Sequence, residues 1–236
     1  MKRILNFALI ACAVFAASSC TFIRINKDAF EAGSGSEVVV GSKNIISKNY
    51  NVPQFTAVES TIAADIVYAM TDSEPYIIVD APDNFIDKLN FKVEDGVLKV
   101  RFDDNRRYNF GKVKVSAFSS TLENLVILGA GDFDCSGLKC AEMNVSINGA
   151  GDVRFGYLEC EGDVAVTVRG AGDIDFHQMS CQDVSVEIMG AGDVTLAGRS
   201  ETAHLSIKGA GDIDASRLDC ENITSSVAGM GSIRRK

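Results

Sequence analysis

The sequence has little of what most enzymes and nucleic-acid-binding proteins depend on. It contains two histidines, His177 and His204, at non-equivalent positions of its repeats, and no nucleophile elbow, HExxH or CxxC motif accompanies them. Basic side chains are the minority, 23 against 32 acidic ones, which gives a net charge of −9. A surface of this sign repels nucleic acid and anionic lipid, so we expect no nucleic-acid partner and no catalytic centre.

Long apolar runs are also scarce. The one candidate, Ile4 to Ala17, is too short to span a bilayer comfortably, and Lys2 and Arg3 before it give it the organisation of a secretory signal. The segment Ala17-Ser18-Ser19-Cys20 resembles a bacterial lipobox. We therefore expect residues 1–19 to be a signal peptide and Cys20 to be lipidated; an ordinary signal peptide cleaved nearby and a noncleaved anchor are the alternatives.

An exported lipoprotein of the cell envelope follows from this reading, with the leaflet and its exposure left open. Removal of Lys2 and Arg3 leaves 21 basic against 32 acidic side chains, a net charge of −11. Attachment to the membrane must then come from the lipid and not from a basic patch. Residues 20–51, rich in Gly, Ser, Asn and Lys, are typical of a tether, and we expect the folded domain to span residues 52–236.

The second half of the chain is repetitive. Gly-Ala-Gly-Asp occurs at Gly129–Asp132, Gly149–Asp152, Gly170–Asp173, Gly190–Asp193 and Gly209–Asp212, with a worn copy at Gly229–Ser232, at spacings of 20, 21, 20, 19 and 20 residues. A period of this length is typical of a solenoid, in which each repeat forms one rung.

Within each rung the apolar residues alternate. Leu125 and Ile127 precede the first glycine corner, Phe133 and Cys135 follow it, and later rungs repeat these offsets. Val-rich and Ile-rich alternation with period two indicates short half-buried strands and leaves no run long enough for an amphipathic helix. The sequence therefore predicts an all-β fold, a right-handed parallel β-helix with rungs of about 20 residues, whose glycines let each corner turn tightly.

The N-terminal half is a less regular β-layer. Residues 61–68 read like residues 208–215 with the glycines lost, and Leu89 to Glu94 and Val97 to Phe102 alternate around Asp95-Gly96. Asp-Gly between two alternating runs is a strong hairpin signal. We expect an irregular layer with a hairpin that gives way to regular rungs after about Val113.

The segments "FTAVESTIAADIVYAM" and "YIIVDAPDNFIDKLNFKVEDGVLKVRF", followed by repeated Gly-Ala-Gly-Asp rungs, resemble the putative auto-transporter adhesin head GIN domain family of bacterial envelope proteins. The resemblance covers about Val52 to Ile233. It implies a right-handed β-helix-like fold, and it supplies no catalytic motif to carry over.

The aspartates of the corners form a predicted ladder: Asp132, Asp152, Asp173, Asp193 and Asp212. Carboxylates about 4.8 Å apart repel, by about 1 kcal/mol per pair in water and by several times that at a partly buried surface, so the ladder must be largely exposed. We expect each Asp to accept hydrogen bonds from the amides of its own corner. A calcium-binding solenoid is the alternative, although one such turn per rung supplies few ligands.

A second predicted column lies two residues further along each rung: Asp134, Arg154, Asp175, Thr195, Asp214 and Arg234. A base or a neutral residue separates the acids of consecutive rungs, which favours cross-strand pairing of opposite charges within the column. This column is a candidate ligand face, and so is the basic-aromatic stretch of Arg106, Arg107 and Tyr108 within residues 103–110, which is otherwise a solvated loop.

The cysteines outside the signal peptide form a third pattern. Cys140, Cys160, Cys181, Ser200 and Cys220 occupy nearly equivalent places, with Cys160 displaced by one residue when counted from the following glycine. Stacked residues project their Cβ atoms in parallel, which suits the disulfide dihedral poorly, and we expect small buried thiols.

Taken together, the residues indicate a non-catalytic, adhesin-like structural or binding module that presents a rigid acidic face to a glycan or an envelope protein. Uniform rungs offer repeated weak contacts but no singular cleft. The alternative is a carbohydrate-active enzyme, since β-helices also host polysaccharide lyases and hydrolases. We expect no cofactor other than the calcium alternative, and the solenoid ends could join copies into an oligomer.

Overall fold

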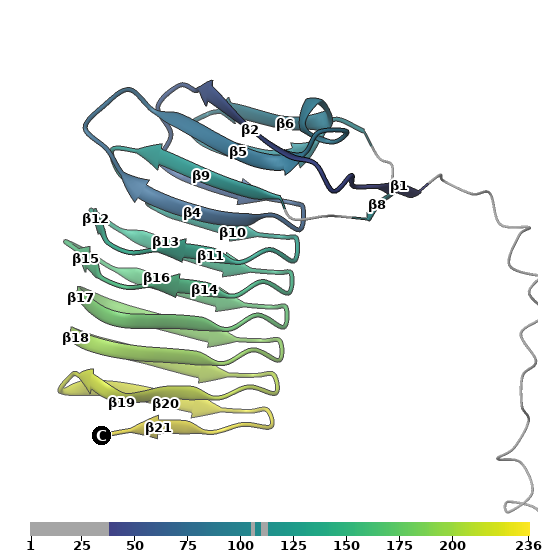
Figure 1. The fold of residues 1–236 in the computed structure, drawn as a ribbon. Helices are drawn as coiled ribbons and strands as arrows, with labels where there is room; N and C mark the ends of the chain where they lie inside the picture. Colours follow the sequence, from purple (N-terminus) through teal and green to yellow (C-terminus); the bar gives the residue numbers. More distant parts are fainter. Residues whose placement is uncertain (1–37, 105–106, 110–112) are drawn as a thin grey trace, which may run out of the picture. The chain divides into compact units, whose positions relative to one another are not determined.

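A computed structural model describes residues 38–104, 107–109 and 113–236. Within these ranges the chain forms strands and one 3-10 turn, η2 (Ile86–Lys88), and no helix there is long and apolar enough to cross a membrane. Figure 1 shows the strands stacked as successive rungs from an N-terminal layer to the C-terminal strand β21. The predicted all-β solenoid is confirmed, with about six turns.

The rungs are made of parallel strands whose pairing follows the 20-residue period. The solenoid contains β3 (Ala57–Ser60), β4 (Asp65–Met70), β10 (Asn124–Ile127), β11 (Phe133–Cys135), β12 (Leu138–Cys140), β13 (Met143–Ile147), β14 (Val153–Phe155), β15 (Leu158–Cys160), β16 (Val164–Val168), β17 (Ile174–Ile188), β18 (Val194–Ile207), β19 (Ile213–Asp219), β20 (Asn222–Val227) and β21 (Ile233–Arg235). Each regular rung contributes to three stacks of strands. Earlier rungs form these stacks with separate strands, whereas β17 and β18 each extend through all three.

We name the three stacks by their place relative to the glycine corner. The first face precedes the corner and contains β3, β10, β13, β16, residues 184–188 and 202–207, and β20. The second face follows the corner and contains β4, β11, β14, residues 174–176 and 194–196, the start of β19, and β21. The third face contains β12, β15, residues 179–181 and 198–200, and residues 217–219.

The core lies inside these three faces because alternate residues of every strand point inward. Phe133, Phe155 and Phe176 are fully buried and stand in register, with ring centroids 5.6 Å apart for the first pair and 5.2 Å apart for the second. Stacking of like residues at equal offsets fills the interior of each rung with the same shape as its neighbour, so the period of the sequence sets the packing.

The N-terminal layer covers one end of this stack. It contains β1 (Val38–Val40), β2 (Ile45–Asn51), β5 (Tyr76–Pro82), β6 (Leu89–Glu94), β7 (Val97–Phe102), β8 (Arg107–Asn109) and β9 (Lys114–Ser119). β2 pairs antiparallel with β5, β5 with β9, and β6 with β7, whereas β9 and β7 join the solenoid through parallel pairing with β4 and β3. The predicted irregular β-layer is therefore a cap built on antiparallel pairs, while β1 and β8 form a separate parallel pair.

The hairpin forms at the predicted residues. β6 and β7 have the expected bounds, and Asp95 and Gly96 between them adopt φ values of 51° and 77°. Two successive positive φ angles are those of a type I′ turn, whose twist matches the flanking strands, and this is why Asp-Gly is favoured there.

The folded part begins earlier than the sequence indicated. Residues 20–51 were expected to be a tether, but β2 forms seven residue pairs with β5, from Ile45 with Pro82 to Asn51 with Tyr76. Its side chains alternate between exposed and half-buried, so its apolar content is low and the segment looks like a linker in composition alone. The expected signal peptide and Cys20 lie outside the described residues.

The worn repeat at residues 61–68 is a rung that lies between other strands of the solenoid. β3 lies between β7 and β10, and β4 lies between β9 and β11, so this early segment is enclosed by later ones. Ile62 and Ala64 occupy the corner against which Gly129 and Gly131 pack, and both are buried.

The corner glycines are required by close approach and not by backbone conformation. A Cβ on Gly151 would overlap the carbonyl oxygen of Gly131, and every corner glycine from Gly129 to Gly231 meets the corner one rung earlier in the same way. The expectation of a glycine-dependent turn is wrong here, because the described glycines with positive φ are Gly96 and Gly198, neither of which belongs to a Gly-Ala-Gly-Asp corner.

Gly151→Ala should therefore lower the free energy of unfolding by about 2 kcal/mol or more, since the methyl group must push two backbones apart. Gly137→Ala is the matched control, because a Cβ at Gly137 meets nothing within 4 Å. Urea denaturation followed by circular dichroism measures both variants, and equal stability of the two would contradict the close-approach explanation.

The thiols stack on the third face. Cys140 pairs directly with Cys160, and Cys181 with Ser200, so the expected one-residue displacement of Cys160 does not occur. Within the described residues the cysteines are free, and burial raises the pKa of Cys135 to about 11 and that of Cys181 to about 12. Such thiols are small apolar fillers that stay protonated at neutral pH.

Candidate functional site

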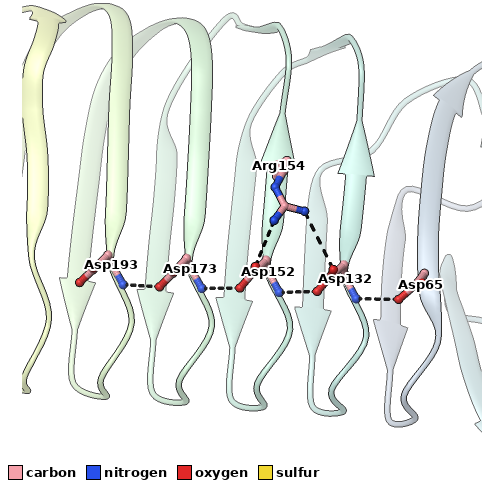
Figure 2. A network of polar contacts seen from close by, with 6 residues as sticks. All are labelled: Asp65, Asp132, Asp152, Arg154, Asp173 and Asp193. Atoms are coloured by element: carbon pink, nitrogen blue, oxygen red, sulfur yellow. Dashed lines mark hydrogen bonds and ion pairs between the residues drawn. The ribbon is translucent and has the colours of Figure 1, made fainter. Parts of the chain in front are cut away.

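The Asp ladder is built at the corner where the first face ends and the second begins. Each rung's glycine pair brings the backbone close to the preceding rung, and the Asp that follows lies one rung from its equivalent. Figure 2 shows Asp65, Asp132, Asp152, Asp173 and Asp193 in line, with a dashed contact from the amide of each Asp to the carboxylate of the Asp one rung earlier.

The contacts are hydrogen bonds between rungs. The backbone N–H of Asp152 donates to Oδ1 of Asp132 at 3.0 Å, that of Asp173 to Asp152 at 3.1 Å, and that of Asp193 to Asp173 at 2.8 Å. The expected donors were amides of the same corner, and this expectation is wrong. The rungs lie so close together that the amide of the following rung is within hydrogen-bonding distance of the carboxylate, so each Asp links two rungs.

The ladder has a defined start and end. Oδ1 of Asp65 accepts the amide of Asp132 at 3.3 Å, which adds the worn rung to the series. At the other end Asp212 accepts both the amide of Ser232 at 2.6 Å and its hydroxyl at 2.9 Å. Ser232 stands where the earlier rungs have an Asp, and its short hydroxyl serves as a second donor to Asp212.

One carboxylate oxygen of each ladder residue is used in this way, which leaves the other at the surface. The side chains of Asp132 and Asp152 are 46% and 37% exposed, and Asp173, Asp193 and Asp212 are exposed. Water around the free oxygens screens the repulsion between neighbours, in keeping with the exposure that the charge spacing requires.

The second predicted column stands in register beside the ladder. Asp134 pairs with Arg154, Arg154 with Asp175, Asp175 with Thr195, Thr195 with Asp214, and Asp214 with Arg234 along the second face. We call these residues the outward column. Its members share the surface of the second face with the ladder, so the two form one acidic edge.

Ion pairs within the outward column were expected for both of its arginines, and one of the two forms such a pair. Arg154 turns to the ladder, with Nη2 3.1 Å from Oδ2 of Asp152 and Nη1 4.0 Å from Oδ2 of Asp132 (Figure 2). Arg234 pairs within the column, 3.1 Å from Asp214. Hydrogen bonds from the Ser216 hydroxyl and amide, together with Arg234, hold the pKa of Asp214 below its ordinary value.

A hollow of about 290 Å³ lies on this acidic edge. Its lining residues come from both columns and from the strand starts between them: Asp152, Val153, Arg154, Asp173, Ile174, Asp175, Asp193 and Thr195. His177 lies at its border, with Nδ1 3.0 Å from Oδ1 of Asp175. The hollow offers several acceptors, one strong donor and no apolar depth, which suits recognition of hydroxyl or cationic groups.

A second hollow, of about 370 Å³, was not found from the sequence. It lies where the third face turns into the first face near the C-terminus, and it is lined by Arg199, Ser200, Glu201, Asp219, Cys220, Glu221 and Asn222. The break of the cysteine pattern at Ser200 was the only sequence signal, and a break in a repeat gives no indication of shape.

The remaining sequence candidates do not join the acidic edge. Tyr108 is 9% exposed, stacks on Phe102 with ring centroids 3.8 Å apart, and donates to Asp104, so its proposed place on a ligand face is wrong. Arg107 lies in β8, which pairs with β1, and Arg106 lies outside the described residues. His204 lies on the first face, far along the rung from His177.

Metal ligation receives no support from the described part of the chain, where no group of three or more His, Cys, Asp or Glu side chains is placed to hold an ion. The ladder carboxylates are arranged in a line and each already accepts an amide, so they do not converge on one point.

These features define the class of protein: a capped parallel β-solenoid with an acidic edge of stacked carboxylates. A family model described as "Putative auto-transporter adhesin, head GIN domain" matches residues 54–235. The chain belongs to this head GIN domain family.

Solved structures share the fold at low sequence identity. A putative adhesin from Bacteroides fragilis is 22% identical with a TM-score of 0.70, covering 84% of this chain and 100% of its own. A putative lipid binding protein from Parabacteroides distasonis is 19% identical with a TM-score of 0.74, covering 85% and 100%. A putative adhesin from Parabacteroides merdae is 18% identical with a TM-score of 0.55, covering 84% and 98%. No curated protein matches the chain.

Two replacements of one ladder residue should distinguish the contribution of its hydrogen-bond acceptor to stability from that of its charge. Asp173→Ala removes the acceptor of the Asp193 amide and should lower the free energy of unfolding by about 1 kcal/mol. Asp173→Asn keeps an oxygen acceptor, removes one repulsive charge and should be at least as stable as the wild type at low salt. Urea titrations measure both, and an Asn variant as weak as the Ala variant would contradict the role of the inter-rung hydrogen bond.

Arg154→Asp should lower the melting temperature more at low salt than at high salt, because it replaces two ladder contacts with repulsion. The effect should be about 1 kcal/mol at low salt and smaller where ions screen it. Arg154→Gln, which removes the charge without inverting it, is the control, and its melting temperature should lie between those of the wild type and Arg154→Asp. A salt-independent loss would show that Arg154 acts through packing instead.

Proposed function

We propose that this protein is a non-catalytic binding module of the bacterial envelope that presents its acidic edge to an extended partner, with a glycan favoured. The observation that carries the proposal is the unbroken register of the ladder and the outward column over successive rungs. A partner with a repeating structure would meet a ladder carboxylate at each rung from Asp132 to Asp212, beside a side chain of the outward column that differs from rung to rung.

The chemistry of the edge suits sugar hydroxyl groups. The free ladder oxygens and Asp175 can accept hydrogen bonds from hydroxyls, and Arg154 and Thr195 can donate to ring and hydroxyl oxygens in the 290 Å³ hollow. Each contact is weak because the edge is open to water. Affinity would come from many contacts made at once along the solenoid, as in multivalent binding.

A binding role is favoured over catalysis by the shape of the surface. The β-helix enzymes of the alternative need acid groups gathered in a deep groove built by long loops. Regular rungs from β10 onward leave little chain for such loops, and the two hollows are lined by polar side chains at the surface. The description of the family as an adhesin head agrees with binding.

An envelope location rests on residues outside the described part of the chain. The secretory signal of residues 1–19 and the lipobox-like segment before Cys20 support export and lipidation. Cys20→Ser should abolish incorporation of labelled palmitate and release the protein from the membrane fraction. Unchanged labelling in this variant would contradict lipidation of Cys20.

The function can be tested with the soluble domain, residues 38–236, on a glycan array and in a crosslinking pull-down from envelope. The binding variant replaces Asp134, Arg154 and Asp175 with Asn, Gln and Asn, which alters the edge but leaves the ladder acceptors in place. Thr167→Ala, on the first face, is the matched control.

Glycan binding that is lost in the triple variant and kept in the control would support the proposal in its favoured form. Envelope proteins captured through the same edge would support the binding module with a protein partner. Binding that the triple variant leaves unchanged, or no binding in either assay, would overturn the role of the acidic edge.

A further inference from the structure

The two ends of the solenoid are finished differently. At the N-terminal end, antiparallel β6 covers β7, and β2 and β5 cover β9. At the C-terminal end, among the described residues, β20 pairs with β18 alone and β21 with β19 alone, while residues 217–219 pair only with β18. We call this the open end. Figure 1 shows it at the last rungs of the stack.

The open end leaves part of the core uncovered. Ile223, Ser225 and Val227 continue the inward positions of Ala203, Leu205 and Ile207, which are buried. Val227 is 46% exposed and Met230, in the last corner, is 80% exposed. A further rung would bury these side chains, and the residues that the structure describes form none there.

The strands of the open end also differ in charge. Charged residues on natural edge strands oppose pairing with another strand. β21 carries two such residues, Arg234 and Arg235, with Lys236 after it. β20, with the sequence Asn-Ile-Thr-Ser-Ser-Val, has neither charge nor proline. It is a neutral edge able to accept another strand.

We propose that the open end binds a second copy of this chain, tail to tail, through antiparallel pairing of the two β20 strands around a two-fold axis. The capped N-terminal end blocks head-to-tail stacking, so the self-association closes at a dimer and does not grow into a fibre. The surface includes β21 with Arg234, the last residue of the outward column, but not the 290 Å³ hollow of the acidic edge, and the proposal stands apart from the proposed function.

The hydrogen bonds of β20 favour one register. The N–H of Ala228 donates to the carbonyl of Ile207 at 2.8 Å, so by alternation the N–H groups of Thr224 and Ser226 also point to β18. The N–H and C=O groups of the three inward residues then point to the open edge. Antiparallel pairing places edge-facing residues opposite each other, and a two-fold axis centred on Ser225 is the arrangement that pairs all three of them.

This register also completes the core. Ser225 lies opposite Ser225 of the second copy, and Ile223 lies opposite Val227, so the two hydroxyls meet and the apolar side chains pair. Both inward rows lie on the same side of the joined sheet. The β20 sequence is therefore complementary to itself in the register that pairs all three edge-facing residues.

Charge complementarity supports the same arrangement. Because the two-fold axis reverses β20, the acidic turn that precedes β20 lies beside the basic strand that follows β20 in the other copy. Asp219 at the end of β19 and Glu221 in the turn border the 370 Å³ hollow, and the other copy brings Arg235 of β21 and Lys236 after it. β21 extends the second face one rung beyond residues 217–219, so each β21 has a recess to occupy.

The test uses residues 38–236, which contain the whole buried core and match solved domains over their full length. Light scattering after size exclusion should give a dimer mass. Ser225→Pro removes an edge-facing N–H that has no partner strand in the monomer, and an edge strand tolerates proline there. It should raise the dimer dissociation constant about tenfold or more, whereas Ser225→Ala, which keeps the N–H, should not.

A charge exchange makes the test independent of the proline. Glu221→Arg and Arg235→Glu should each weaken the dimer, and the double variant should restore it, because the two residues face each other across the axis. A monomeric wild type at the highest soluble concentration, a dimer indifferent to Ser225→Pro, or a double variant no stronger than its parents would each overturn the proposal.

Discussion

The contact on which the rest of the structure depends is the approach of each glycine corner to the carbonyl of the corner before it. No side chain fits between them, so the rungs stand at one backbone spacing along the whole solenoid. This spacing brings the amide of each Asp to the carboxylate one rung earlier and lays Phe133, Phe155 and Phe176 over one another. Hydrogen bonding and core packing both follow from it.

The same spacing creates an electrostatic cost that shapes the surface. Carboxylates one rung apart repel, and the fold lowers this cost by using one oxygen of each as an amide acceptor and leaving the other in water. Arg154 offsets part of the remaining charge by reaching two ladder residues. A structural device thus produces an acidic edge, and a binding function can use what the stacking of rungs has already placed in register.

The cap and the open end give the solenoid a direction. Antiparallel strands can finish a stack because they present a different edge from the one they cover, and the chain uses them only at its N-terminal end. The last rung keeps the repeat's inward residues without a rung to cover them. Association through that end and binding in the 290 Å³ hollow of the acidic edge involve different residues, so one can occur without the other.

Local patterns in the sequence determined much of this protein. Alternation placed the inward residues, Asp95-Gly96 fixed the hairpin, and the 20-residue period predicted the rungs, because each depends on neighbours close in the chain. Only the tertiary structure decided which amide meets each ladder Asp, that β3 and β4 lie between later strands, that β2 belongs to the cap, and that Tyr108 is buried. These depend on segments far apart in the chain that come together through packing, and periodicity carries no information about such partners.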